Sequence, residues 1–243
     1  RYSDGEMFIL QRKELLHDNQ KIIIGDLEIP HVYPEENHKH YIPSEHEVQA
    51  KLLEDSFLFE KKNYYKGIIS SNVVAEGNEE QYKFQFEMLN KTKTEVDNDE
   101  YFTFADLFVN GNYPYFLEHL LPYFFNYDTS IVCSEKANVD GLPFKVKKSF
   151  RVGQNCFVKQ QDLFEEIKTY IESNNISNNL FLFAASSLSE VLIQRLFEFN
   201  DTNTYLDIGT CLNIFMGIDI DRNYLRGYWL NSGEPDVRKI NVW

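Results

Sequence analysis

A chain of 243 residues with 43% hydrophobic and 15% aromatic residues can bury a sizeable core, which excludes a disordered protein. Its net charge of −14, from 24 Lys+Arg against 38 Asp+Glu, argues against a surface that binds nucleic-acid phosphates. The cysteines (Cys133, Cys156, Cys211) are odd in number and lack metal-ligand spacing, so we expect reduced thiols in a cytoplasmic protein.

No apolar run reaches the length of a membrane span and no signal peptide is visible, so we expect no transmembrane segment. The chain begins at Arg1 without a methionine, and we expect the natural chain to extend before it.

The first half of the chain alternates short apolar runs with helical patterns. We expect a strand over 21–29 and a helix over 43–60, where Ser44 and Glu47 have the spacing of a capping box. The aromatic stretch at 113–126 is expected to form a helix broken or kinked at Pro122. Further strands are expected at 63–70, 100–110 and 129–135, and a further helix at 79–93.

The second half repeats this rhythm more clearly. Helices are expected over 161–175 and 187–200, and strands over 178–187 and 203–210. The basic stretch 144–151 alternates apolar and charged residues, which indicates an exposed strand whose lysines could meet anions. Strands separated by helices favour a parallel sheet with helices on both faces. The sequence therefore predicts one Rossmann-like α/β domain over residues 1–243.

Ligands of an open parallel sheet collect at the carboxyl ends of its strands. Small or polar residues occupy the expected strand-end loops at 3–6, 110–114, 134–138, 184–189 and 207–213. Ser186 and Ser187 come just before a helix, whose N-terminal amides favour a phosphate, although serine is also an ordinary N-cap there. The candidate substrate-binding residues of these loops are Gly5, Asn110, Asn112, Glu135, Ser186, Ser187, Gly209 and Thr210.

The two ends of the chain resemble one family. "RYSDGE" at 1–6 resembles the Arg-aromatic-small-Asp-Gly-Glu signature of the GT-D glycosyltransferases. Residues 180–209 have that family's order of a strand, a small-residue loop, a helix and a strand ending in Asp-Ile-Gly. The resemblance implies transfer of a sugar from a nucleotide-diphosphate donor, with a UDP-sugar favoured, to a hydroxyl of a glycan or glycoprotein.

The resemblance also implies roles for single residues. Asp4 and Glu6 are expected to hold Mn²⁺ or Mg²⁺, because the leaving diphosphate gains negative charge and these ions prefer oxygen ligands. Arg1 is expected to contact a phosphate oxygen. Asp207 is expected to direct a hydroxyl of the sugar or the acceptor, and either Asp207 or His119 is a candidate for the base that takes the acceptor's proton.

The expected geometry brings residues 4–6 and 207–210 to one cleft. The chain departs from the family at Thr210, where other members usually have histidine. Two alternatives stay open. One is a SAM-dependent methyltransferase, because "TYLDIGTCLN" resembles the first motif of that class, although it lacks the second glycine of the motif. The other is a non-catalytic domain that binds a nucleotide or partner.

One further cluster invites a metal interpretation. His31, His38, His40 and His46 lie close together in sequence, among prolines. We interpret this stretch as an irregular loop rather than a metal site.

Overall fold

The computed structural model describes residues 1–17, 21–24, 27–30, 39–69, 79–90, 102–218 and 222–230. By their internal packing they form two compact units, each assembled from several segments of the chain. Unit 1 comprises Arg1–Ala105, Gly153–Leu163 and Ser186–Gln194, and unit 2 comprises Asp106–Val152, Phe164–Ala185 and Arg195–Trp243. The expectation of a single domain over 1–243 stays a prediction.

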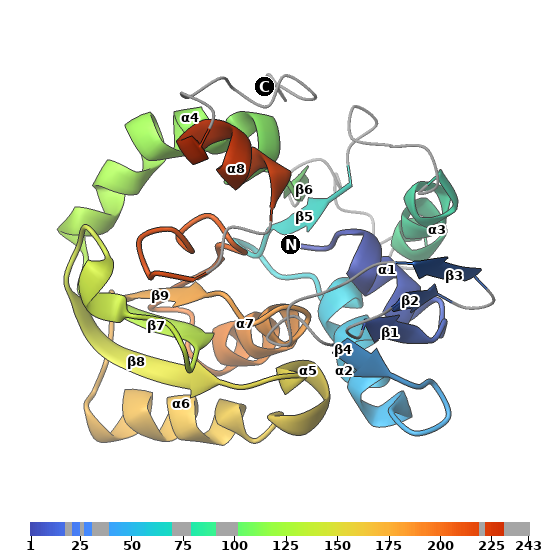
Figure 1. Cartoon of the computed structure of the whole chain (residues 1–243). Helices are drawn as coiled ribbons and strands as arrows, with labels where there is room; N and C mark the ends of the chain where they lie inside the picture. Colours follow the sequence, from blue (N-terminus) through green and yellow to red (C-terminus); the bar gives the residue numbers. More distant parts are fainter. Residues whose placement is uncertain are drawn as a thin grey trace. The chain divides into compact units, whose positions relative to one another are not determined.

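Unit 2 is built on a four-stranded sheet in which every neighbouring pair of strands is parallel (Figure 1). The spatial order is β10-β9-β7-β8, with β7 at Thr129–Ser134, β8 at Val146–Val152, β9 at Leu180–Phe183 and β10 at Thr204–Asp207. The central strands β7 and β9 are almost fully buried, which explains the apolar runs at 131–133 and 180–183. The predicted α/β, Rossmann-like fold is confirmed.

Helices cover both faces of this sheet. Ile131 of β7 and Leu182 of β9 point to one face, where they share a core with Phe116 of the aromatic stretch. Phe150 of β8 packs on α6 (Leu163–Ser173), where its ring centroid lies 5.6 Å from that of Tyr170. Side chains alternate along a strand, so a strand with apolar residues at successive positions needs both layers.

The aromatic stretch is helical, with a change of helix type near Pro122. The 3-10 turn η5 (Asn110–Asn112) leads into α4 (Tyr113–Tyr115), which continues as the π-helical η6 (Phe116–Leu120) and the 3-10 helix η7 (Leu121–Asn126). Proline has no N–H, so it cannot continue the hydrogen bonding of the preceding turn. Unit 2 also contains η8 (Val139–Gly141) and α8 (Asn223–Leu230).

Unit 1 mixes helices with two small sheets. Where one strand is expected over 21–29, the structure has β2 (Lys21–Ile24) and β3 (Leu27–Pro30), which pair antiparallel. They belong to the sheet β3-β2-β1-β4, completed by β1 (Leu15–His17) and β4 (Lys39–Tyr41). The other elements are α1 (Asp4–Leu10), α2 (Glu47–Leu58), α3 (Glu79–Leu89), α5 (Cys156–Lys159) and the parallel pair β5 (Lys66–Ile68) and β6 (Phe102–Phe104). Helix α7 (Leu188–Phe199) runs from unit 1 into unit 2.

Helix α2 begins later than the sequence pattern predicts. Residue 46 is its N-cap, and no side chain makes a capping hydrogen bond there. The N–H groups of Glu45 and His46 both donate to the carbonyl of Ile42, so these residues form a turn before the helix. The capping box predicted at Ser44 is therefore wrong, because this turn occupies the position where the helix was expected to start.

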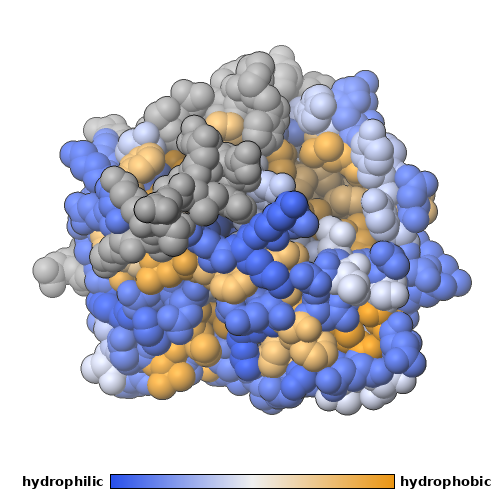
Figure 2. All heavy atoms as spheres, turned by 180° about the vertical axis from the view of Figure 1, so that it is seen from behind, coloured by the Kyte–Doolittle hydropathy of each residue, from blue (hydrophilic) through white to orange (hydrophobic). Residues whose placement is uncertain are grey.

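None of the helices in the described part of the chain is long and apolar enough to cross a membrane. Figure 2 shows one face of the molecule, where hydrophobic residues form small patches among hydrophilic ones.

Candidate functional site

The Asp-Gly-Glu segment forms the first turn of helix α1. Ser3 is the N-cap of this helix, and its N–H donates to Oε2 of Glu6 at 3.0 Å. This is a capping-box arrangement, in which the third helical residue reaches back to the N-cap. The Ser-x-x-Glu spacing at 3–6 is typical of a capping box, so this role of Glu6 could have been predicted from the sequence.

The second carboxylate oxygen of Glu6 joins α1 to the loop at residues 184–187, which precedes α7 and is called the serine loop below. The Ser187 hydroxyl donates to Oε1 of Glu6 at 2.6 Å. Both residues are buried, with 8% of Glu6 and 2% of Ser187 exposed. The structure thus brings together two predicted site residues that lie 181 positions apart.

Tyr2 anchors the chain just before α1, and sequence reasoning did not single it out. Its N–H donates to the carbonyl of Gly67 in β5 at 2.7 Å, and its buried hydroxyl donates to Oγ of Ser56 at 2.9 Å. The backbone nitrogen of Arg1 lies 3.6 Å from Oε1 of the buried Glu190, in the first turn of α7. These contacts explain why an aromatic residue follows the arginine: it fixes the position of the segment that carries Asp4.

Asp4 differs from Glu6 because it is exposed. Its Oδ1 accepts hydrogen bonds from the Ser3 hydroxyl and the Gly5 N–H, at 3.0 and 2.9 Å, and no hydrogen bond from the described residues reaches Oδ2. A Cβ atom added to Gly5 would meet nothing within 4 Å. The protein's own packing therefore does not require glycine here, and the first turn of α1 has open space beside it.

The residues of this segment fit a divalent cation only in part. Helical positions i and i+2 do not face each other, so Asp4 and Glu6 diverge around the helix. Glu6 uses both oxygens for Ser3 and Ser187, whereas Asp4 offers an exposed oxygen of the kind that Mn²⁺ and Mg²⁺ prefer. Within the described residues, no group of three or more His, Cys, Asp or Glu could hold a metal ion. The expectation of one shared ion stays a prediction, and the geometry favours Asp4 as its ligand.

The histidine cluster is described only in part, because His31 and His38 lie outside the described residues. The rings of His40 and His46 have centroids 6.4 Å apart, and Nδ1 of His46 accepts the N–H of Ile42. This hydrogen bond occupies one ring nitrogen of His46 as part of the turn before α2.

The serine loop contains a strained residue. Ser186 is exposed and has φ of +52°, in the left-handed region that residues other than glycine adopt infrequently. Backbone strain of this kind clusters at functional sites, where the surrounding structure holds it in place. Ser186 therefore presents its hydroxyl at the surface while its neighbour Ser187 is fixed to Glu6.

The sheet of unit 2 defines a second candidate region by its topology. From β7 the chain moves to β8 on one side, and it then returns to β9 and β10 on the other. The order reverses between β7 and β9, and ligands of open parallel sheets bind at the carboxyl ends of the strands at such a point. Glu135, which is exposed, follows β7, and the small residue Ala184 follows β9.

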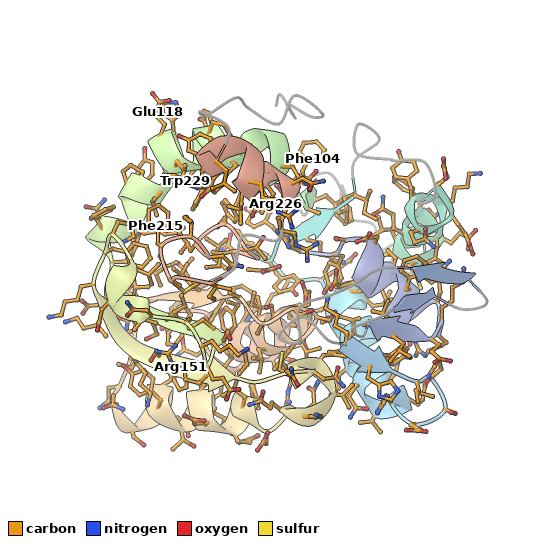
Figure 3. The ribbon with its side chains drawn as sticks, in the orientation of Figure 1. Phe104, Glu118, Arg151, Phe215, Arg226 and Trp229 are labelled. Atoms are coloured by element: carbon orange, nitrogen blue, oxygen red, sulfur yellow. The ribbon has the colours of Figure 1, made fainter. Side chains whose placement is uncertain are left out.

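Arg151 holds the loop that follows β7 (Figure 3). Its Nη1 donates to the carbonyls of Ser134 and Ala137, at 3.1 and 2.7 Å. The sequence pattern predicts a strand here correctly, but β8 is mostly half-buried or buried rather than exposed. The loop contacts of this arginine could not be read from the pattern. Arg151 shapes the backbone beside Glu135.

The Asp-Ile-Gly segment after β10 is also fixed by its own hydrogen bonds. Oδ1 of Asp207 accepts the N–H of Gly209 at 2.8 Å, and Gly209 has φ of +51°. The hydroxyls of Thr210 and Tyr224 lie 2.7 Å apart, which ties this loop to α8. Asp207 is partly exposed. Its carboxylate is therefore held by the backbone of Gly209 and is still accessible to solvent.

Asn110 and Asn112 have local structural roles. The Asn110 side chain donates to Oδ1 of Asp106, and the buried Asn112 side chain donates to the Asp106 carbonyl. Asn110 has φ of +53°, a conformation that asparagine tolerates better than most residues. These contacts explain both asparagines as formers of the turn at η5, and their binding role stays a prediction.

The possible nucleophiles and bases can be compared by their environments. All three cysteines are buried and free, and burial raises the pKa of the Cys133 thiol and raises that of Cys156 to about 11. These two thiols are therefore protonated near neutral pH and unsuited to attack. His119 is exposed, with Nε2 at 3.7 Å from Oε2 of Glu118.

The predicted site residues thus fall into two groups. Unit 1 contains Arg1, Asp4, Gly5, Glu6, Ser186 and Ser187, and unit 2 contains Asn110, Asn112, Glu135, Asp207, Gly209 and Thr210. The expected convergence of residues 4–6 and 207–210 on one cleft stays a prediction.

Solved structures share this fold. Two of them match 90% of this chain and 75% of their own, with a TM-score of 0.51 and 15% sequence identity. One is described as the selenomethionine-substituted structure of domain of unknown function 1792, and the other as that domain with a distinct glycosyltransferase fold. No model of a known family matches the chain, and a search of curated proteins finds no match.

The chain therefore has a glycosyltransferase fold. More specifically, it has the fold of domain of unknown function 1792, so the resemblance to the GT-D glycosyltransferases is confirmed for the fold.

Proposed function

We propose that this protein is a glycosyltransferase that moves a sugar from a nucleotide-diphosphate donor, most simply a UDP-sugar, to a hydroxyl of a glycan or glycoprotein. The observation that carries the proposal is the shared fold together with the hydrogen bond between Glu6 and Ser187. That bond places the Asp-Gly-Glu segment directly against the serine loop, and both segments carry the family resemblance.

The donor diphosphate is proposed to bind beside the start of α1 and the serine loop. Ser186 supplies an exposed hydroxyl, and α7 supplies the N-terminus of a twelve-residue helix, which favours an anion. Arg1 would add a positive charge toward a phosphate oxygen. Asp4 would hold a divalent cation, and such an ion offsets the charge that develops on a leaving diphosphate.

The acceptor is proposed to be activated without a covalent enzyme intermediate. Direct attack by an acceptor hydroxyl needs a base and no protein nucleophile, which agrees with the raised pKa values of Cys133 and Cys156. Asp207 and His119 are the two candidates for this base. Asp207 is also proposed to direct a hydroxyl of the donor sugar or acceptor, with Gly209 and Thr210 forming the adjacent backbone.

Ligand-dependent thermal unfolding tests this proposal. A ligand that binds the native state raises the unfolding temperature, so UDP should stabilise the protein, and more strongly when Mn²⁺ is present. S-adenosylmethionine should have no effect. Stabilisation by S-adenosylmethionine alone would favour the methyltransferase, and no response to any nucleotide would favour a non-catalytic domain.

A further inference from the structure

Helix α8 is joined to the segment that follows β10. The hydroxyls of Thr210 and Tyr224 lie 2.7 Å apart. Five residues further along α8, Trp229 packs on Phe215, with ring centroids 5.9 Å apart and ring planes nearly perpendicular at 86°. Figure 3 shows Phe215 on this segment and Trp229 on α8. Because β10 ends at Asp207, α8 lies near the carboxyl edge of the sheet, where ligands of such folds bind.

The polar atom of Trp229 is satisfied inside the protein. Its Nε1–H donates to the hydroxyl of the buried Tyr113 at 3.0 Å. The Tyr228 ring lies 5.1 Å from it at 75°, so Trp229 is held by three neighbouring aromatic residues. Its position is therefore fixed without help from a ligand.

A substantial part of this fixed ring is nevertheless exposed. Trp229 has 41% of its surface accessible. Arg226 lies three residues earlier, on the same side of α8, and is also exposed. A fixed indole three residues from an exposed arginine on one helix offers an apolar surface and nearby donors for hydroxyl groups, which is the composition that a sugar ring requires of its binding site.

We propose that Trp229 is a stacking platform for a pyranose ring, with Arg226 as a hydrogen-bond donor beside it. The C–H groups on one face of a sugar carry slight positive charge, whereas the face of an indole is negative. The sugar can belong to the donor or to the acceptor. The proposal rests on the proposed glycosyltransferase function, since that function supplies a sugar at this edge.

Tryptophan fluorescence gives a direct test. The chain has two tryptophans, Trp229 and Trp243, so Trp243→Phe leaves Trp229 as the only one. This variant is titrated with UDP, UDP-glucose, UDP-galactose, UDP-N-acetylglucosamine and the methyl glycosides of the same sugars. We expect a saturable change in fluorescence with sugars and none with UDP alone. A change with UDP-sugars only identifies the donor as the source, and a change with methyl glycosides identifies the acceptor.

Substitution separates stacking from structural support. Half-saturation of the variants is measured by thermal-shift titration, which does not depend on tryptophan fluorescence. Trp229→Ala should weaken half-saturation for the responding sugar about 5- to 150-fold, the range for loss of one aromatic partner of a stacked nucleobase. Trp229→Phe keeps an aromatic face and should recover most of that loss. Tyr123→Ala is the control, because Tyr123 is more exposed, at 64%, and should change half-saturation less than twofold.

The outcomes distinguish this proposal from the function on which it rests. If UDP stabilises the protein but no sugar changes Trp229 fluorescence, the platform is refuted and the transferase stands. A full response to UDP alone would also refute it, because the ring would then stack on the base. If no nucleotide stabilises the protein but methyl glycosides still change the fluorescence, the platform stands as a carbohydrate site and the transferase does not.

Discussion

The hydrogen bond from Ser187 to Glu6 makes a quantitative prediction about stability. Ser187→Ala removes a 2.6 Å bond to a carboxylate in a pair where both residues are buried. Hydrogen bonds to charged groups contribute about 1.5–3 kcal/mol, and a buried acceptor that loses its donor is costly. For a chain of this size, each kcal/mol lowers the unfolding temperature by about 2–4 °C, so a decrease of roughly 3–12 °C is expected.

Thermal unfolding followed by circular dichroism measures this change, and the neighbouring serine provides a matched control. Ser186 is exposed, and its side chain makes no hydrogen bond with the described residues. Alanine at 186 keeps the same left-handed backbone, so Ser186→Ala should shift the midpoint by less than about 1 °C, as surface substitutions usually do. If Ser187→Ala and Ser186→Ala were equally stable, the bond between Glu6 and Ser187 would not have the structural role assigned to it.

Four further substitutions test the Asp-Gly-Glu turn and the packing of η8. Asp4→Asn should remove the extra thermal stabilisation that Mn²⁺ adds when UDP is bound, whereas Glu6→Gln should keep it. Thermal-shift titrations measure this difference. If both variants lost the Mn²⁺ effect equally, one ion shared by Asp4 and Glu6 would be supported instead. Gly5→Ala should raise the free energy of unfolding by about 0.5–1 kcal/mol, because the added Cβ has open space in a helix. A stable Gly5→Ala protein with reduced sugar transfer would place the donor against this turn, and a destabilised one would contradict the observed packing. Gly141→Ala should lower the free energy of unfolding by about 1–3 kcal/mol in urea melts, because its Cβ would overlap the backbone carbonyl of Phe215; unchanged stability would contradict the close approach of these segments.

Short-range patterns explain why much of the fold could be predicted. The apolar runs around Ile131 and Leu182 are typical of strands covered on both faces, and these strands are central in the sheet. The alternation of strands and helices in the second half predicts parallel pairing, which the structure confirms. The early antiparallel sheet was harder to predict, because strands of three or four residues contain too few positions to show a period.

By itself, the sequence determined the parallel α/β core and the likeness to a glycosyltransferase fold, because both depend on the order and spacing of residues along the chain. Only the tertiary structure decided how the site residues are used. Glu6 and Asp4 are two positions apart and look equivalent in sequence, yet one is buried against Ser187 and the other is exposed. The contact of Arg151 with the loop after β7 and that of Trp229 with Tyr113 could likewise not be predicted from the sequence. Hydrogen-bond partners far apart in the chain are chosen by which segments the packed core brings together, and local patterns do not contain that information.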